Sequence, residues 1–333
     1  MKRSAGPPVP MSDSNRTGLS FFLTGLPGLE AVHAWLSIPL GAMYVASLAG
    51  NGLILWVVRS EPSLHRPMYY FLSMLAVTDL GLSLFWFNVR EIDMDACLVQ
   101  MFFIHVFSLT ESGILLTMAF DRYVAISNPL RYTTLLTSST IANIGVGLLA
   151  RAVAVIFPGP FLIKRLRFCE ANVLSHSYCL HPDIIKLSCS DHRISSIYGL
   201  VMILTTFGVD AALILLSYVK ILITVLGIAS REEQLKALNT CVSHVCAVLL
   251  VYVPMIGVSV IHRFGKHVPP VVHIIMGYIY LLMPPVLNPV VYCIKTQEIR
   301  TRILVLTSHK SYNNQLSLQQ VPKTYRGRGD MQP

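Results

Sequence analysis

Charged residues are scarce in this chain of 333 residues: only 13% are Asp, Glu, Lys or Arg, whereas 53% are hydrophobic. Soluble domains carry about 25% charged residues, so this composition, with a mean hydropathy of +0.59, excludes an ordinary soluble protein. The residue patterns of common enzymes are also missing, since there is no GxSxG elbow, HExxH helix or phosphate-binding glycine loop. The histidines are scattered without the spacing of a metal site, and the net charge of +9 forms no nucleic-acid-binding stripe. A membrane protein that is not an enzyme is therefore expected.

Seven apolar segments dominate the sequence. They cover roughly residues 31–58, 68–89, 98–120, 141–163, 195–228, 238–261 and 270–294, and each is near or above the about 20 residues that span a bilayer as a helix. We therefore expect an all-α membrane protein with a seven-transmembrane-helix bundle in one domain over residues 31–295. Because the number of spans is odd, the two termini lie on opposite sides of the membrane.

Basic residues in the short loops predict the orientation. They follow the first, third, fifth and seventh segments, as Arg59, Arg131 and Lys295 illustrate, and such loops are typically cytoplasmic. The N-terminal segment 1–30 is then extracellular, where Asn15 would be a glycosylation acceptor, and it has no recognisable cleavable signal peptide. Residues 296–333 are expected in the cytoplasm, as an amphipathic helix over 296–306 followed by a disordered tail.

Charged residues inside the apolar segments call for a functional reason, because a charge in a bilayer is costly unless it faces a polar interior. Asp121 and Arg122 end the third segment at its cytoplasmic side. While Asp121 holds it, the guanidinium of Arg122 stays at the inner face, and on release it could reach a cavity opened by the sixth helix. A simple interfacial anchor is the alternative reading of this pair.

Two further acids, Asp79 and Glu111, lie at membrane depth in the second and third segments. Two carboxylates that are close together cannot both ionise easily, so they either share a proton or hold a cation between them. Sodium is the candidate ion, and Asn51 and Asn288 would complete a polar core. The sequence leaves the two possibilities open.

Several motifs spread along the chain carry a family resemblance. They are LTGLPGLE at 23–30, Gly50-Asn51, PMYYFLSMLAVTDL at 67–80, MAFDRYVAISNPLRY at 118–132, Ser217-Tyr218, KALNTCVSH at 236–244, HRFG at 262–265 and PPVLNPVVY at 284–292. From about Phe21 to Leu306, the chain resembles the olfactory receptors of the fish-like class I, family 51 type. The resemblance implies a plasma-membrane receptor that binds an odorant-type small molecule and activates a stimulatory heterotrimeric G protein of the olfactory kind.

The resemblance also implies the residues of the switch and the disulfides. The switch residues would be Asp121, Arg122, Tyr123, Tyr218, Asn288, Pro289 and Tyr292, with Tyr252 as the ligand-sensing toggle. Four cysteines on the outer side suggest two disulfides with three possible connectivities. The resemblance selects the pairs Cys97–Cys179 and Cys169–Cys189.

The ligand site is expected in the outer half of the bundle. On the third segment, helical spacing puts one set of residues on a shared face, namely His105, Ser108, Leu109 and Ser112. On the sixth, Ser259 and Arg263 align in the same way, and a guanidinium beside a hydroxyl suits a carboxylate, so fatty acids are the favoured ligands. Alternatively, Arg263 forms a loop salt bridge with Glu170, Asp183 or Asp191, and His105 is an interior hydrogen-bonded group.

One departure from the family pattern falls in the second segment. Relatives typically carry about nine more residues, resembling STLPTMLGI, before the FWFN word at 85–88, and nine helical residues rise about 13 Å. The second helix could still span if Phe85, Trp86 and Phe87 are drawn into it. A retained, non-signalling form of the receptor is therefore the alternative function. A small transporter or channel is weaker, because the two halves show no repeat of hydropathy.

Overall fold

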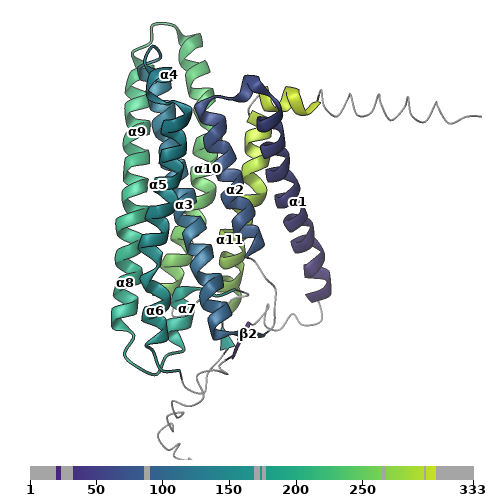
Figure 1. The fold of residues 1–333 in the computed structure, drawn as a ribbon, viewed down its shortest axis with the longest axis vertical. Coiled ribbons are helices and arrows are strands. Elements are labelled where there is room, and N and C mark those ends of the chain that lie inside the picture. Colours follow the sequence, from purple (N-terminus) through teal and green to yellow (C-terminus); the bar gives the residue numbers. More distant parts are fainter. Residues whose placement is uncertain are drawn as a thin grey trace, which may run out of the picture.

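The computed structural model of this protein describes residues 20–23, 33–85, 91–168, 173–174, 178–264, 268–295 and 298–304. Long helices run side by side along the longest axis of the molecule (Figure 1). They are α1 (His33–Ser60), α2 (Pro67–Leu84), α3 (Met94–Ser127), α5 (Ser138–Ile156) continued by α6 (Pro158–Lys164), α8 (Arg193–Ile203) continued through a π-helical turn η4 (Leu204–Gly208) into α9 (Val209–Leu226), α10 (Arg231–Phe264) and α11 (Pro270–Lys295).

These helices form the expected bundle of seven spans. Within the described residues, six helices are long and apolar enough to cross a membrane, and α2 is the seventh, with 18 residues and Asp79 in its second half. The outward surface carries large apolar side chains such as Val146 and Leu215, which are 70% and 66% exposed. A surface of this kind is stable against lipid rather than water. The polar side chains point into the bundle, where Asp79, Glu111 and Asp210 are buried.

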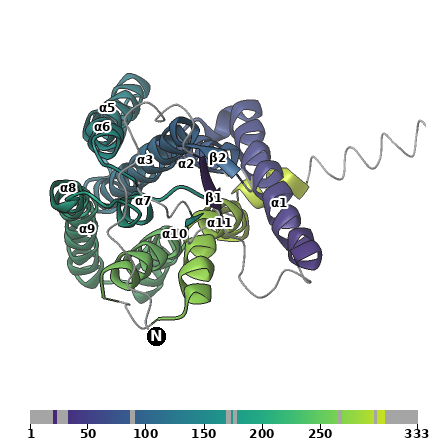
Figure 2. The same ribbon diagram turned by 90° about the horizontal axis from the view of Figure 1, so that it is seen from below.

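A small sheet and short helices cover the outer end, at the bottom of Figure 1. The strand β1 (Ser20–Leu23) lies between β2 (Glu91–Asp93), to which it is antiparallel, and β3 (Val173–Leu174), to which it is parallel. The short helix α7 (His181–Lys186) belongs to the same outer loop as β3. Figure 2, seen from this end, shows the sheet over the bundle beside α11.

Disulfides fix this outer cap. Cys97 at the start of α3 is bonded to Cys179 of the outer loop, which confirms the pairing that the resemblance implied. Both cysteines are fully buried among Phe21, Ile92 and other apolar side chains of the cap. Cys189 is also in a disulfide. Its expected partner Cys169 lies outside the described residues, as do Glu170 and the glycosylation acceptor Asn15.

The second helix is short, and its end is held by side chains of α3. α2 ends at Leu84, so Phe85 is not drawn into the helix, and Trp86 and Phe87 lie outside the described residues. The Phe85 ring stacks on Phe103 with 4.3 Å between ring centroids. The Gln100 amide donates to the Phe85 carbonyl at 3.0 Å and accepts from the Cys179 N–H at 2.9 Å. Gln100 thereby joins the end of α2 to the outer loop.

At the inner end, short elements connect and support the long helices. A 3₁₀ turn, η3 (Pro62–Leu64), links α1 to α2, and α4 (Tyr132–Leu135) follows α3. Residues 298–304 are helical, within the range expected to form an amphipathic helix. Its buried Ile299 packs on the bundle core, and its Arg302 pairs with Glu61 at 3.5 Å. One face is thus apolar and docked, and the other is charged.

Candidate functional site

A polar core lies at the centre of the bundle between α2, α3 and α11. The Asn288 amide donates to Asp79 at 3.2 and 3.5 Å and to Glu111 at 3.4 Å, so the two acids share one donor. The Asn51 amide donates to the Pro285 carbonyl at 2.8 Å and ties α1 to α11. The side-chain oxygen of Asn288 is buried and has no hydrogen-bond partner among the described residues. The structure therefore joins three of the four polar residues expected here, namely Asp79, Glu111 and Asn288, whereas Asn51 bonds the backbone of α11.

A second buried network joins four helices on the inner side of the outer half. The Ser112 hydroxyl lies 2.8 Å from both the Asp210 carboxylate and the Tyr252 hydroxyl. Arg151 of α5 donates to the two Asp210 oxygens at 3.0 and 2.5 Å. The π-helical turn η4 ends two residues before Asp210, and such turns recur at functional sites because they change which face of a helix later residues present. The network contains Tyr252 and Ser112, both singled out from the sequence.

The sequence reading missed Arg151 and Asp210. The available signal was the cost of a charge at membrane depth, since both residues lie inside apolar segments. What the sequence could not show is that a side chain from the fourth span meets one from the fifth. In the structure Asp210 is 1% exposed, so its pairing with Arg151 is what makes its burial tolerable.

The expected ligand residues of α3 have different neighbours. Ser108 is buried and accepts a hydrogen bond from Tyr280 of α11 at 2.9 Å, an interaction not foreseen from the sequence. Leu109 packs with Val106, Ala152 and Ile156 toward α5. The Nδ1 atom of His105 lies 2.7 Å from the Met101 carbonyl, as in the interior reading of this residue. On α10, Ser259 is half-buried, and the Arg263 side chain lies outside the described residues.

The outer loop rests on the ends of α10 and α11. His262 Nδ1 lies 3.1 Å from the Lys186 ammonium and 3.5 Å from the Asp183 carboxylate, and both partners belong to α7. Burial raises the pKa of Asp183 to about 6, which Lys186 and His273 only partly oppose. The Tyr178 hydroxyl donates to the Gly277 carbonyl at 3.1 Å, and burial raises the pKa of that tyrosine as well. This part of the loop is therefore held against α10 and α11.

The inner end of α3 contains a closed ionic latch. Arg122 donates to Asp121 through two nitrogens at 3.0 and 2.6 Å, and Asp121 also accepts from the Tyr132 hydroxyl at 2.8 Å. Burial and the neighbouring Asp121 raise the pKa of Tyr132, so this hydroxyl remains a donor. Both side chains are largely buried, since Asp121 is 1% and Arg122 16% exposed.

The other residues expected to form a switch have separate contacts on α9, α10 and α11. Tyr218 of α9 bonds His244 of α10, and the Tyr292 hydroxyl of α11 lies 4.0 Å from the Met118 sulfur. Tyr123 packs against a cluster of α9 and α10 that includes Ile221 and Cys241. Pro289 sits so close to Gly50 that a β-carbon added to the glycine would lie 2.9 Å from it, which fixes the approach of α1 to α11. In the described part of the chain, no cluster of three or more His, Cys, Asp or Glu side chains could hold a metal ion.

A seven-helix bundle with a latched Asp-Arg pair at its inner end and a disulfide-bound cap at its outer end is the architecture of a G-protein-coupled receptor. The family model described as "Olfactory receptor" matches residues 40–310, and the chain belongs to that family. Olfactory receptor 51I2 of Homo sapiens is 59% identical over 298 residues, which cover 87% of this chain and 96% of that protein.

Other human relatives give the same assignment. Olfactory receptor 51G2 of Homo sapiens is 56% identical over 88% of this chain and 96% of its own. Olfactory receptor 51F2 of Homo sapiens is 53% identical over 93% of this chain and 94% of its own. The protein is therefore an odorant-sensing, multi-pass receptor of the plasma membrane that couples to a G protein, and it is not an enzyme.

Proposed function

We propose that this receptor binds a small carboxylic acid in the outer half of its bundle and activates a stimulatory heterotrimeric G protein of the olfactory type. The observation that supports it best is the hydrogen-bonded chain from Asp210 through Ser112 to Tyr252. It links α9, α3 and α10 on the inner side of the helical turns that carry Ser108 and Ser259. A ligand that contacts α3 and α10 above it would change how these helices pack.

The acid preference rests on Arg263 and Ser259, which lie one helical turn apart at the outer end of α10. A guanidinium binds a carboxylate through two parallel hydrogen bonds, and the hydroxyl adds a third. Two of the loop acids that could compete for Arg263 have other cations beside them. Asp183 lies near Lys186 and His262, and Asp191 lies 3.9 Å from Arg193. His105, Ser108 and Leu109 would line the same pocket from α3.

The proposed signal passes along α10 to the inner latch. A shift of α10 would change the contact between His244 and Tyr218 of α9. Arg122, released from Asp121, would then turn toward the space that α10 vacates, where a helix of the G protein binds. Asn288, Pro289 and Tyr292 would transmit the same movement through α11, because Pro289 interrupts its backbone hydrogen bonds.

The test is a cAMP response to saturated fatty acids in cells that express the stimulatory G protein. Arg263→Ala should abolish the response while surface staining is unchanged, if the guanidinium binds the ligand as proposed. Arg193→Ala is the matched control, because Arg193 is an outer-loop arginine whose side chain is 87% exposed. An Arg263→Ala receptor that still responds to acids like the parent would contradict the acid-binding role.

We also propose that Asp79 and Glu111 bind a sodium ion, with no other cofactor required. Two carboxylates and the buried oxygen of Asn288 give a set of oxygen ligands that share a single donor, the Asn288 amide. Hard cations prefer oxygen ligands of this kind. A proton shared between the two acids is the competing state, and the two states differ in their dependence on sodium.

A receptor that is retained inside the cell is the second candidate function, favoured by one observation. α2 has only 18 residues, which rise about 27 Å, whereas the neighbouring α1 and α3 have 28 and 34. A short second span would weaken the outer packing without touching the inner latch. Surface staining separates this candidate from the signalling receptor.

A further inference from the structure

Four titratable side chains from three elements meet where the outer loop rests on the helix ends. Asp183 and Lys186 belong to α7, His262 to the last turn of α10 and His273 to the beginning of α11. The side chains of Asp183 and His262 are only 3% and 4% exposed, whereas that of Lys186 is half exposed. The two histidine rings lie edge to face with 5.5 Å between their centroids. A buried carboxylate and a buried imidazole thus share one partly solvated ammonium.

One atom of this cluster, Nδ1 of His262, has two neighbours that require it in opposite states. The Lys186 ammonium lies 3.1 Å away and can only donate, so its hydrogen bond requires a nitrogen without a proton. The Asp183 carboxylate lies 3.5 Å away and can only accept while it is ionised, so it requires a proton on the same nitrogen. The Lys186 contact is the shorter of the two. Which neighbour is bonded therefore depends on a single proton.

The elements around the cluster add little charge of their own. Tyr178 faces Asp183 from the loop, and burial keeps the pKa of this tyrosine well above its usual value, so it stays neutral. His181 of α7 is directed toward α8, where its Nε2 atom lies 3.1 Å from a buried serine hydroxyl. Lys164, at the end of α6, is paired with Asp95 at 2.7 Å. These groups leave the proton balance to the cluster itself.

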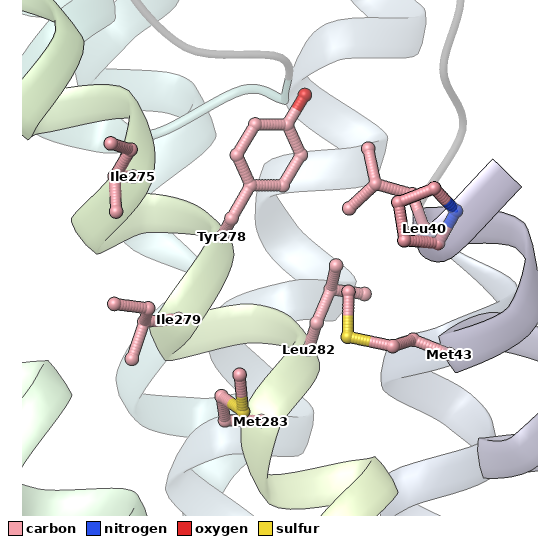
Figure 3. A pocket seen from close by; sticks show the side chains of 8 residues that line it. Leu40, Met43, Ile275, Tyr278, Ile279, Leu282 and Met283 are labelled. Carbon is pink, nitrogen blue, oxygen red and sulfur yellow. The ribbon is translucent and has the colours of Figure 1, made fainter. Parts of the chain in front are cut away.

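The two long helices beside the cluster give the same result. On α10, Arg263 follows His262, and its side chain lies outside the described residues. On α11, the side that faces α1 adds no charge, because Ile275, Ile279 and the other side chains that line the crevice there are uncharged (Figure 3). Among the described side chains near the cluster, the four named above therefore determine its charge.

We propose that this cluster is a proton switch that locks the outer loop onto α10 in acidic extracellular fluid and so slows the exchange of odorant. An added proton can be bound by the Asp183 carboxylate or by the His262 imidazole, and both placements put it between the same two atoms. An imidazolium donates to a carboxylate, and a carboxylic acid donates to an imidazole. In both cases the hydrogen bond from Lys186 is lost, and this half-exposed side chain turns to the solvent.

The protonated cluster holds the loop more tightly than the form with Lys186 as the donor. A contact of a solvated ammonium contributes little, because water competes for it. The bond between Asp183 and His262 is buried and charge-assisted, and it joins α7 directly to α10. Burial raises the pKa of Asp183 to about 6, so the folded loop takes up the proton more readily than the unfolded chain. The added stability is therefore present at about pH 5 and is lost above about pH 7.

The locked segment covers the outer end of the expected odorant pocket. Tyr178 and Leu180 of the loop pack in one cluster with Ile104 of α3 and Val258 of α10, and all four side chains are buried. A molecule that enters the space between α3 and α10 from the outer side must displace this segment. The inference rests on the proposed function for the location of the pocket, but not for the acid preference or for Arg263.

The experiment measures the lifting of the loop without an odorant. Purified full-length receptor with Val258→Cys is treated with methyl methanethiosulfonate, a small neutral thiol reagent, at about pH 5 and about pH 7.4. Mass spectrometry follows the labelling of the introduced cysteine. Arg193→Cys supplies the reference rate, because this position is exposed at both pH values. Since both lie below the usual thiol pKa of about 8.5, acid lowers the two thiolate fractions by the same factor.

Labelling at position 258, relative to the reference, should be about fivefold slower at the lower pH, because the pKa of Asp183 rises from 3.8 to about 6 on folding. Asp183→Asn and His262→Gln, each combined with Val258→Cys, should flatten this difference. His192→Gln is the matched control, because this histidine precedes α8 in the same outer loop. A pH dependence that survives both substitutions in the cluster would overturn the proposal.

Lys186→Met separates a switch from a merely structural contact. A neighbouring cation opposes protonation of both the acid and the imidazole, so its removal lets the proton bind at higher pH. Labelling at about pH 7.4 should therefore become slower in Lys186→Met, whereas the loss of a structural contact would make it faster. Faster labelling would contradict the switch. A pH dependence that disappears in His273→Gln but persists in His262→Gln would assign it to α11 instead. These readouts require neither surface expression nor cAMP, so a failure of the acid-ligand proposal would leave them unaffected.

Discussion

At the residue scale, the sequence identified which polar side chains lie in the membrane but not all their partners. Asp79 and Glu111 were expected to meet because both acids lie at membrane depth, with Asn288 of the PPVLNPVVY motif completing the polar core, and the structure joins them through the Asn288 amide. Arg151 and Asp210 have no such motif, and their contact depends on how α5 and α9 turn about their axes. Helical periodicity predicts which residues share a face of one helix, but it does not predict which residues of another helix they contact.

The sodium proposal makes a prediction at this scale. Replacing sodium by choline at constant ionic strength should lower the thermal stability of the purified receptor, and sodium at ten times its Kd would restore about 1.4 kcal/mol. The Asp79→Asn variant should melt equally in both salts, because one carboxylate of the pair is gone. Differential scanning fluorimetry provides the measurement. Identical melting of the parent in sodium and choline would favour the shared proton.

At the element scale, the lengths of the apolar segments predicted where the spanning helices lie. They did not predict where the helices end, because the ends depend on packing. The third apolar segment was expected at about 98–120, yet α3 extends from Met94 to Ser127, because the disulfide and the ionic latch lie in its end turns. The strands β1 to β3 were not expected, since each has only two to four residues and its apolar pattern is too short to read. The π-helical turn η4 has no sequence signature of its own.

The short helix α7 should make the outer loop sensitive to pH. Asp183 has a pKa of about 6 in place of 3.8, so the folded loop binds more protons than the unfolded chain between these values. The resulting stability is present below the unfolded pKa and is lost as the pH rises through the folded pKa. From about pH 5 to about pH 7, this group alone should cost about 1 kcal/mol of loop stability.

Hydrogen exchange of the amides of α7 measures this effect. Exchange in the parent should be slower at the lower pH, after correction for the intrinsic rate, and Asp183→Asn should flatten the difference. Lys186, His262 and His273 also face the carboxylate, and they are unchanged in this variant. Asp191→Asn is the control, because that side chain is 72% exposed. An equal pH response in Asp183→Asn would assign the effect to the histidines.

At the scale of the whole molecule, the inner and outer halves differ in how tightly they pack. The largest core cluster joins Ile54, Leu75, Met118, Val251 and Tyr292 from five helices in the inner half. In the outer half, α2 has ended, and none of the described side chains of α1 between Trp35 and Ala46 is buried. The sequence predicted this weakness from the missing residues, but it could not show that Phe85 and Gln100 would close the end of α2 against α3.

Restoring about nine residues that resemble STLPTMLGI between Ser83 and Phe85 should lengthen α2 by about 13 Å and cover α1. We expect stronger surface staining of an N-terminally tagged receptor in intact cells. Flow cytometry against total expression measures the staining, and nine residues inserted into the tail after Lys310 serve as the length control. Equal surface staining of parent and restored chains would show that the short helix is tolerated.

The position of β1 in the middle of the outer sheet also determines the order in which the cap is assembled. Ser20–Leu23 is made first, yet its partner β3 is at Val173–Leu174, beyond the fourth spanning helix. During synthesis, β1 therefore cannot pair with β3 until four helices have been inserted. Cys97 likewise cannot form its disulfide until Cys179 has reached the lumen of the endoplasmic reticulum. The outer face is thus completed late in biogenesis, and oxidation of this pair marks the passage from an inserted chain to a closed receptor.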